Sequence, residues 1–120
     1  MKKLILLLST TLPIAISAAT NSPAPSLPNP TFANVSYGPH ARNVVDLWQA
    51  ESRKPAPLLV FIHGGGWRGG DKSSLPPDLL QIMREHGVSV ASINYRYSEI
   101  QKLPAPVHDA ARAIQFIRSK

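Results

Sequence analysis

The pattern of hydrophobic and polar positions predicts four strands. Residues 57–62 run without a polar interruption, which is typical of a strand covered on both faces in a parallel sheet. Residues 88–95 form the next predicted strand along the chain. Its expected core positions are Val88, Val90, Ile93 and Tyr95. Upstream, residues 33–37 and 44–49 are predicted to pair as a hairpin, because a turn-forming Gly-Pro pair lies between them.

Two helices are predicted around the later strand. The first has Ser73 or Ser74 as its N-cap, two prolines in its first turn and Gly87 as its stop. Its expected buried stripe consists of Leu79, Leu80, Ile82 and Met83. The second covers residues 105–118, with apolar positions at helical spacing: Val107, Ala110, Ala111, Ile114 and Ile117. A hairpin followed by strand, helix, strand and helix predicts an α/β fold with parallel central strands.

The N-terminal residues are typical of an export signal. Residues 1–19 combine a basic start, a short apolar stretch and small residues before a cleavage site, which we place after Ala19, with Ser17 as second choice. The apolar stretch is broken by polar residues and a proline and falls short of the ~20 residues that a spanning helix needs. We therefore expect a periplasmic or secreted protein without a stable membrane anchor. Residues 20–31 form a predicted Pro-rich linker with nothing to bury, and residues 32–120 the folded domain.

Composition excludes several classes of function. Cleavage would remove Lys2 and Lys3 and lower the formal net charge from +6 to +4. The remaining basic residues are scattered rather than gathered in runs, so we predict no nucleic-acid binding. The chain has no cysteine, and its four histidines lack ligand spacing, so no metal site is expected.

A glycine-rich stretch follows the apolar run directly, as His63-Gly64-Gly65-Gly66-Trp67. Glycines at the end of a buried strand leave backbone N–H groups open to a negative charge at close range. The dinucleotide fingerprint shares this spacing, but its helix begins within the glycines, and here Pro76 and Pro77 would fall inside that helix. A phosphate loop would need glycine where Asp71 stands. We therefore predict no nucleotide or other cofactor.

The stretch resembles the H-G-G-G motif of α/β-hydrolase-fold esterases and lipases, in particular the BD-FAE-like carboxylesterases. Other motifs follow in that family's order: Tyr37-Gly38, Val45-Asp46-Leu47, Gly70-Asp71-Lys72, Ile93-Asn94-Tyr95-Arg96-Tyr97 and residues 104–109. The resemblance covers residues 34–120. It implies the N-terminal part of an α/β-hydrolase fold, in which an initial β-hairpin is followed by β-α-β-α with parallel central strands.

The same resemblance implies roles for the loop residues. The N–H groups of Gly64 and Gly65 would supply part of an oxyanion hole, and Gly66 would let the loop turn. Trp67 would line the acyl or leaving-group pocket, or else pack beneath the loop, and both interpretations stay open. The family's catalytic histidine follows the nucleophile in sequence, so His63 is expected to hydrogen-bond nearby loop backbone instead.

Two carboxylates invite a catalytic interpretation that we do not adopt. His108 and Asp109 are helix neighbours whose side chains diverge by ~100°, so they cannot form an acid–base pair. The resemblance implies a structural role for Asp109. Asp71 could cap a helix or form a salt bridge with Lys72 or Arg96, but an ordinary surface carboxylate is the preferred interpretation.

The nucleophile elbow G-x-S-x-G does not occur in residues 1–120. The nearest string places Ser89 inside a strand, with Ala91 where the closing glycine belongs. We therefore expect the chain to be truncated before the nucleophile-elbow strand, to lack the Ser-Asp-His triad and to be inactive alone. Residues 58–62 would then be an exposed edge that aggregates or takes up a complementing chain.

The expected function is that of the N-terminal fragment of an exported serine hydrolase acting on small-molecule carboxylic esters. One alternative is a non-catalytic, truncated or split hydrolase remnant that serves at most as an interaction module. A second is an arylformamidase-like amide hydrolase, because such enzymes carry a similar H-G-G-x-W loop.

Overall fold

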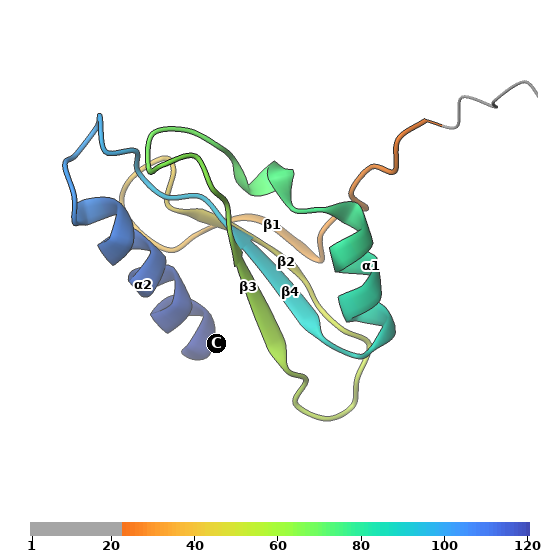
Figure 1. The fold of residues 1–120 in the computed structure, drawn as a ribbon. Coiled ribbons are helices and arrows are strands. Elements are labelled where there is room, and N and C mark those ends of the chain that lie inside the picture. Colours follow the sequence, from red (N-terminus) through yellow and green to blue (C-terminus); the bar gives the residue numbers. More distant parts are fainter. Residues whose placement is uncertain (1–22) are drawn as a thin grey trace, which may run out of the picture.

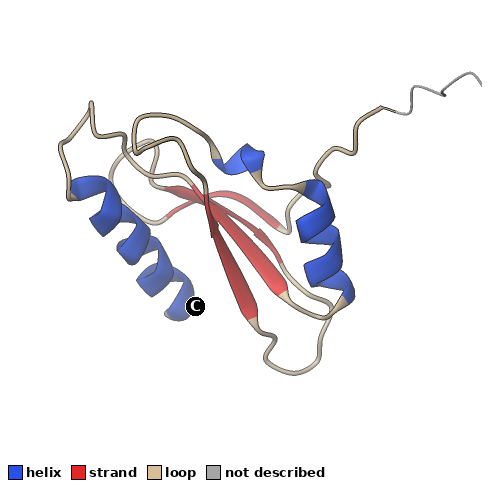
Figure 2. Cartoon of the chain, in the orientation of Figure 1, coloured by secondary structure: helices blue, strands red, loops and turns tan. Residues whose placement is uncertain are grey.

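The computed structural model describes residues 23–120, which fold into a four-stranded mixed sheet with a helix on each face (Figures 1 and 2). The expected export signal and its cleavage site lie outside the described residues. Along the chain the elements are β1 (Phe32–Ser36), β2 (Val44–Trp48), β3 (Leu58–Ile62), the 3-10 turn η1 (Lys72–Ser74), α1 (Pro77–Glu85), β4 (Ser89–Ile93) and α2 (Ala105–Arg118). The predicted α/β class and element order are confirmed.

The strands lie in the order β1-β2-β4-β3. β1 and β2 form the predicted antiparallel hairpin, β2 pairs antiparallel with β4, and β3 pairs parallel with β4. This order makes β4 an interior strand and leaves β3 at an edge, as expected for residues 58–62. All five residues of β4 are buried, whereas both end residues of β3 are exposed. As expected, β3 packs on both faces, with Val60 against the cluster on the α2 face and Leu59 and Phe61 against the cluster on the α1 face. Its outer edge, however, has no neighbouring strand within the described residues.

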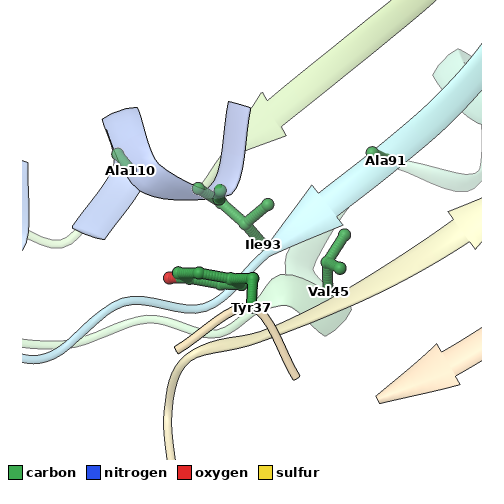
Figure 3. Packing of buried hydrophobic residues seen from close by; sticks show 6 residues of the cluster. Tyr37, Val45, Ala91, Ile93 and Ala110 are labelled. Atoms are coloured by element: carbon green, nitrogen blue, oxygen red, sulfur yellow. The ribbon is translucent and has the colours of Figure 1, made fainter. Parts of the chain in front are cut away.

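Two hydrophobic clusters lie on the two faces of the sheet. On the α2 face, Ala91 and Ile93 of β4 pack with Tyr37, Val45 and two alanines of α2 (Figure 3). On the α1 face, Val90 packs with Trp48, Leu75 and Leu80. Alternate residues of one strand point to opposite faces, so a single strand, β4, contributes to both clusters. The predicted core residues Val90, Ile93 and Tyr95 are buried, and Val88 is partly buried.

α1 begins later than the sequence predicted. Ser73 and Ser74 do not cap it; they belong to η1, which Asp71 caps by accepting a hydrogen bond from the Ser73 N–H at 2.9 Å. The helix starts at Pro77. The residue before a proline avoids the helical region, so Leu75 and Pro76 are extended and separate the turn from the helix. The predicted stop is confirmed, since Gly87 adopts φ +72°.

The buried faces of both helices differ in part from the predicted stripes. In α1, Ile82 is 49% exposed although Leu80 is buried. In α2, the predicted core positions Val107, Ala111 and Ile114 are exposed. The residues that α2 buries are Ala105, Pro106, Asp109, Ala110 and Ala113. The carboxylate of Asp109 lies on the buried side of the helix, where it pairs with Arg96, and three of the five predicted apolar positions lie outward.

The predicted linker contacts the domain, contrary to the expectation that it buries nothing. Leu27 packs against the α1-side cluster, and the Trp48 indole N–H donates to the Pro28 carbonyl at 2.9 Å. The Thr31 hydroxyl accepts from the Gln49 N–H at 3.0 Å. The boundaries of the predicted linker, residues 20–31, stay a prediction. Within residues 23–120, no helix is long and apolar enough to cross a bilayer.

Candidate functional site

The loop that leaves β3 is irregular and closes on itself. Gly65 has φ +122°, and a Cβ there would lie 2.2 Å from the Gly69 carbonyl oxygen. Gly70 has φ +96°, and a Cβ there would lie 2.3 Å from the Gly64 carbonyl oxygen. Only glycine permits such close backbone contacts in this conformation. These two contacts hold the start and the end of the loop against each other.

The amides of the three motif glycines are available to a ligand. Among the hydrogen bonds of residues 23–120, none uses the N–H of Gly64, Gly65 or Gly66 as a donor. The Gly65 carbonyl accepts from the Arg68 N–H at 3.0 Å, which forms a tight turn rather than a helix. The dinucleotide fingerprint needs a helix starting at these glycines, and the structure has none there. The loop therefore offers exposed, unpaired donors.

His63 lies beneath the loop and is 3% exposed. Its Nδ1 lies 2.8 Å from the Gly64 carbonyl oxygen, and its ring stacks on Tyr95 with centroids 4.4 Å apart. A carbonyl can only accept, so Nδ1 carries the proton of that hydrogen bond. The Tyr95 hydroxyl donates to the His63 carbonyl at 2.9 Å. Burial and the neighbouring Tyr97 raise the pKa of Tyr95. His63 thus contacts loop backbone and a tyrosine.

Trp67 lies at the turn of the loop in a left-handed conformation, with φ +64°. Its ring is tilted against that of Tyr95 at a centroid distance of 5.0 Å, and its side chain is partly buried. Its carbonyl accepts from the Ser98 N–H at 2.7 Å. The indole is therefore packed in part against Tyr95.

Asp71 is partly exposed, as expected of a surface carboxylate, but it also acts as a cap and belongs to a polar network at the end of the loop. Besides capping η1, it accepts from the Asn94 amide at 2.8 Å, and Asn94 in turn accepts from the Lys72 N–H at 2.7 Å. Burial raises the pKa of Asp71, but the hydrogen bonds from Ser73 and Asn94 outweigh this effect and leave the pKa lowered. The Lys72 ammonium contacts the carboxylate of the buried Asp46. The network ties the end of the loop to β2 and β4.

Asp109 pairs with Arg96 and not with His108. The Asp109 side chain is fully buried and accepts from Arg96 Nη2 at 2.7 Å and Nε at 2.8 Å. Its burial raises the pKa, but the hydrogen bonds from Arg96 outweigh this and hold the pKa of Asp109 below its usual value. His108 is exposed. As predicted, His108 and Asp109 do not pair with each other in the described residues, and Asp109 instead forms a buried ion pair with Arg96.

Tyr37, which follows β1 of the hairpin, is bonded to the segment just after β4. Its hydroxyl donates to the Asn94 carbonyl, and burial raises its pKa to about 12. The motif residues quoted above as a resemblance are thus mostly those whose polar atoms brace the loop. Sequence reasoning placed them in order along the chain but missed these contacts. The signal in the sequence that could have indicated these contacts is the high density of polar residues just after the strands.

Comparisons with known proteins agree with this geometry. The sequence model of the BD-FAE family matches residues 45–120. The chain belongs to the BD-FAE family. Among curated relatives, esterase LipQ of Mycobacterium tuberculosis is 34% identical over 90 residues, which cover 72% of this chain and 21% of LipQ. The chain therefore spans about a fifth of the length of this relative. The family is one of carboxylic ester hydrolases.

Solved structures show the fold. A truncated form of a carbohydrate esterase from gut microbiota matches with a TM-score of 0.65 at 24% identity, over 79% of this chain and 36% of that one. A bacterial heroin esterase matches with a TM-score of 0.58 at 30% identity, over 70% of this chain and 27% of that one. The described residues of this BD-FAE member therefore form part of an α/β-hydrolase fold, as the motif order implied.

Proposed function

We propose that this chain supplies the oxyanion-holding loop of an exported carboxylic ester hydrolase. In this proposal the N–H groups of Gly64 and Gly65 donate to the ester carbonyl oxygen as it becomes negative. Donors of this kind contribute ~3 kcal/mol each to lowering the barrier, because they act on charge that exists only in the tetrahedral state. The observation that carries the proposal is that these amides have no partner in the described residues, although the surrounding backbone is tightly braced.

The attacking serine, its histidine base and the acid would come from residues beyond Lys120. A serine nucleophile forms an acyl-enzyme that water then hydrolyses, and no cofactor or metal is needed. Within residues 23–120, no group of three or more metal-ligating side chains comes together. We expect His63 to hold the loop backbone, and Trp67 to contact the acyl or leaving group.

The proposed substrates are small esters with an aryl or short acyl group, including carbohydrate-linked acetyl or feruloyl groups. A carbohydrate esterase and a heroin esterase among the structural neighbours support this range. Export is proposed from residues 1–19 alone.

Substitution of Gly64 tests the oxyanion assignment without strain. A Cβ at Gly64 would meet no atom within 4 Å, so Gly64→Ala leaves the fold intact but puts a methyl group where the substrate carbonyl approaches. In the complete protein that contains this chain, we expect kcat on p-nitrophenyl acetate to fall about 100-fold. Gly69→Ala is the matched control, because a Cβ there also lies in open space and Gly69 donates no proposed bond. Full activity of Gly64→Ala would exclude the assignment.

A second measurement separates the enzyme from a non-catalytic remnant. We expect a fluorophosphonate probe to label the complete protein at a serine beyond Lys120 and to leave this chain alone unlabelled. Labelling of Ser73, Ser89 or Ser92 would show that the nucleophile lies within this chain. A complete protein that is neither labelled nor active would favour the interaction module.

A further inference from the structure

The position of the motif glycines depends on a residue that the motif does not contain. Gly70 lies directly against the start of the loop: a Cβ on it would come within 2.3 Å of the Gly64 carbonyl oxygen and 2.4 Å of His63 Nδ1. Any shift of the Gly70 peptide therefore pushes on Gly64 or leaves a gap beside it. Where Gly70 sits decides where the Gly64 carbonyl, and the Gly65 amide bonded to it, can sit.

The Gly70 carbonyl is held by two side chains from other segments. Arg42 Nη2 donates to it at 3.1 Å, and the Tyr97 hydroxyl donates to it as well. Gly70 is a left-handed residue in a loop without regular structure, so these two bonds replace the support that a helix or sheet would give.

Arg42 is itself fixed by three further groups. Its Nε donates to the Tyr95 carbonyl at 2.9 Å, its guanidinium lies 3.9 Å above the Tyr97 ring centroid, and its Nη1 is 3.8 Å from the Asp71 carboxylate. The side chain is 22% exposed. It reaches from the loop of the hairpin, between β1 and β2, to the end of β4 and the end of the glycine loop. One planar side chain thus joins three segments that lie far apart in the sequence.

We propose that Arg42 is a positioning residue for the oxyanion loop, setting the Gly64 and Gly65 amides through the Gly70 peptide. This inference rests on the proposed function. The contacts of Arg42 within the described residues are with Gly70, Asp71, Tyr95 and Tyr97, and not with the motif glycines themselves. A guanidinium suits the task because its fork donates in two fixed directions while its face stacks on an aromatic ring. Lysine can stack or donate once, but it cannot reproduce both donations and the stack together.

The first test follows the loop itself in this chain, without any need for activity. All seven glycines can be labelled with ¹⁵N and observed by NMR. In Arg42→Lys and Arg42→Gln we expect the signals of Gly64, Gly65, Gly66 and Gly70 to shift or broaden, while Gly87 after α1 stays in place. Tyr97→Phe, which keeps the ring and loses one donor to Gly70, should give a smaller change at the same glycines.

The matched control is Arg53→Gln, because Arg53 is exposed and its side chain makes no hydrogen bond or ion pair within the described residues. It removes the same charge and should move none of the loop signals. Unchanged loop signals in folded Arg42→Gln would overturn the proposal. A variant that fails to fold shows all glycines at unfolded positions, and Arg42→Lys, which keeps the charge, then decides.

The second test uses the complete protein and separates positioning from simple stability. We expect Arg42→Lys to lower kcat about 10- to 100-fold with little change in KM, because misplaced donors weaken contacts made mainly in the transition state. A purely structural role would lower the melting temperature and leave kcat unchanged below it. An inactive and unlabelled wild-type protein would contradict the proposed function, whereas an active wild type with an equally active Arg42→Lys would contradict only the role of Arg42.

Discussion

β3 and β4 lie side by side in register, yet they end up in opposite environments. β3 consists only of large apolar residues, Leu58–Ile62, and both of its ends are exposed. β4 contains two serines, Ser89 and Ser92, and is buried along its whole length. The less hydrophobic strand is the better buried one because it has a hydrogen-bonded neighbour on each side and a helix over each face. Hydrophobicity therefore predicts that a strand belongs to a core, but not its place in the sheet.

The serines of β4 are tolerated because each finds a partner. The Ser92 hydroxyl donates to the Lys72 carbonyl at 2.7 Å, and the Ser89 hydroxyl accepts from the Ala50 N–H at 3.0 Å. A buried hydroxyl without a partner would cost about 1–3 kcal/mol. Here the two hydroxyls instead attach the strand to the segments beside it.

The segments that follow the two strands differ in how far their polar groups are paired. After β4, Asn94 and Arg96 are fixed by side-chain hydrogen bonds to Asp71 and Asp109. After β3, the motif glycines keep their amides unpaired within the described residues, while the Gly64 carbonyl accepts from His63 Nδ1 and the Gly65 carbonyl from the Arg68 N–H. The hydrogen-bonded segment after β4 thus supports the glycine loop after β3. The amides of that loop stay free for a ligand at a defined position.

The largest expected effect comes from breaking the support after β4. Asp109→Asn keeps the shape but removes the charge, which leaves the Arg96 guanidinium without its carboxylate. We expect a loss of about 3–5 kcal/mol in the free energy of unfolding, measured by denaturant titration. Glu99→Gln, at an exposed carboxylate, is the control and should change little. A loss below about 1 kcal/mol would show that the pair does not hold the strand end.

The same carboxylate predicts how stability depends on pH. Its pKa is lowered in the folded state, so its contribution is complete above the ordinary aspartate pKa of about 4 and is lost as the pH falls below that value. The wild-type chain should therefore weaken in this acid range. Asp109→Asn should show a flatter acid limb in pH-dependent unfolding followed by circular dichroism.

The direct comparison of the two strands uses the register pair Ile62 and Ile93. Ile93 is fully buried and Ile62 is 40% exposed. We expect Ile93→Ala to cost about 2–5 kcal/mol of unfolding free energy. Ile62→Ala should cost about 1 kcal/mol or less, because much of its apolar surface is already in water. If Ile93→Ala does not fold, Ile93→Val, at about 0.5–1.5 kcal/mol, keeps the comparison measurable. Equal costs at the two positions would contradict it.

The smallest effect on folding, but a clear one on association, is expected at the free edge of β3. An apolar, uncharged edge strand is a template for pairing with another chain, and one lysine blocks such pairing. Leu58→Lys should change the unfolding free energy by less than about 0.5 kcal/mol and reduce association in sedimentation experiments. Gln115→Lys adds the same charge on the exposed face of α2 and serves as the control. A wild-type chain that is already monomeric would contradict the prediction.

Much of the fold could be predicted because it follows from local patterns. The bounds predicted for α2 agree with the structure, and the two hairpin strands were placed within about one residue of their observed ends. The start of α1 was misplaced because Ser73 and Ser74 were interpreted as N-caps, whereas the prolines that follow them delay the start of the helix to Pro77. The buried face of α2 could not be predicted, because Asp109 points inward only once Arg96, thirteen positions earlier, arrives at the same place.

The candidate site also combines a part that local patterns predicted with a part that depends on contacts between distant residues. The glycine motif was found from the sequence because an apolar run that leads into consecutive glycines is a local pattern. Its roles in binding an oxyanion stay a prediction. The contacts of Arg42, Asn94 and Asp46 with the end of the glycine loop were missed. Each of these residues lies more than 20 positions from its partner in the loop, and none belongs to the stretch 63–67.

By itself the sequence determined which segments become strands and helices, and where a loop of side-chain-free residues interrupts them, because steric limits and hydrophobic periodicity act between near neighbours. Only the tertiary structure decided that the serine-containing strand lies in the interior, that β3 lies at the edge, and that a side chain from the hairpin loop braces the glycine loop. These features depend on contacts between distant segments, whose geometry is set when the sheet assembles.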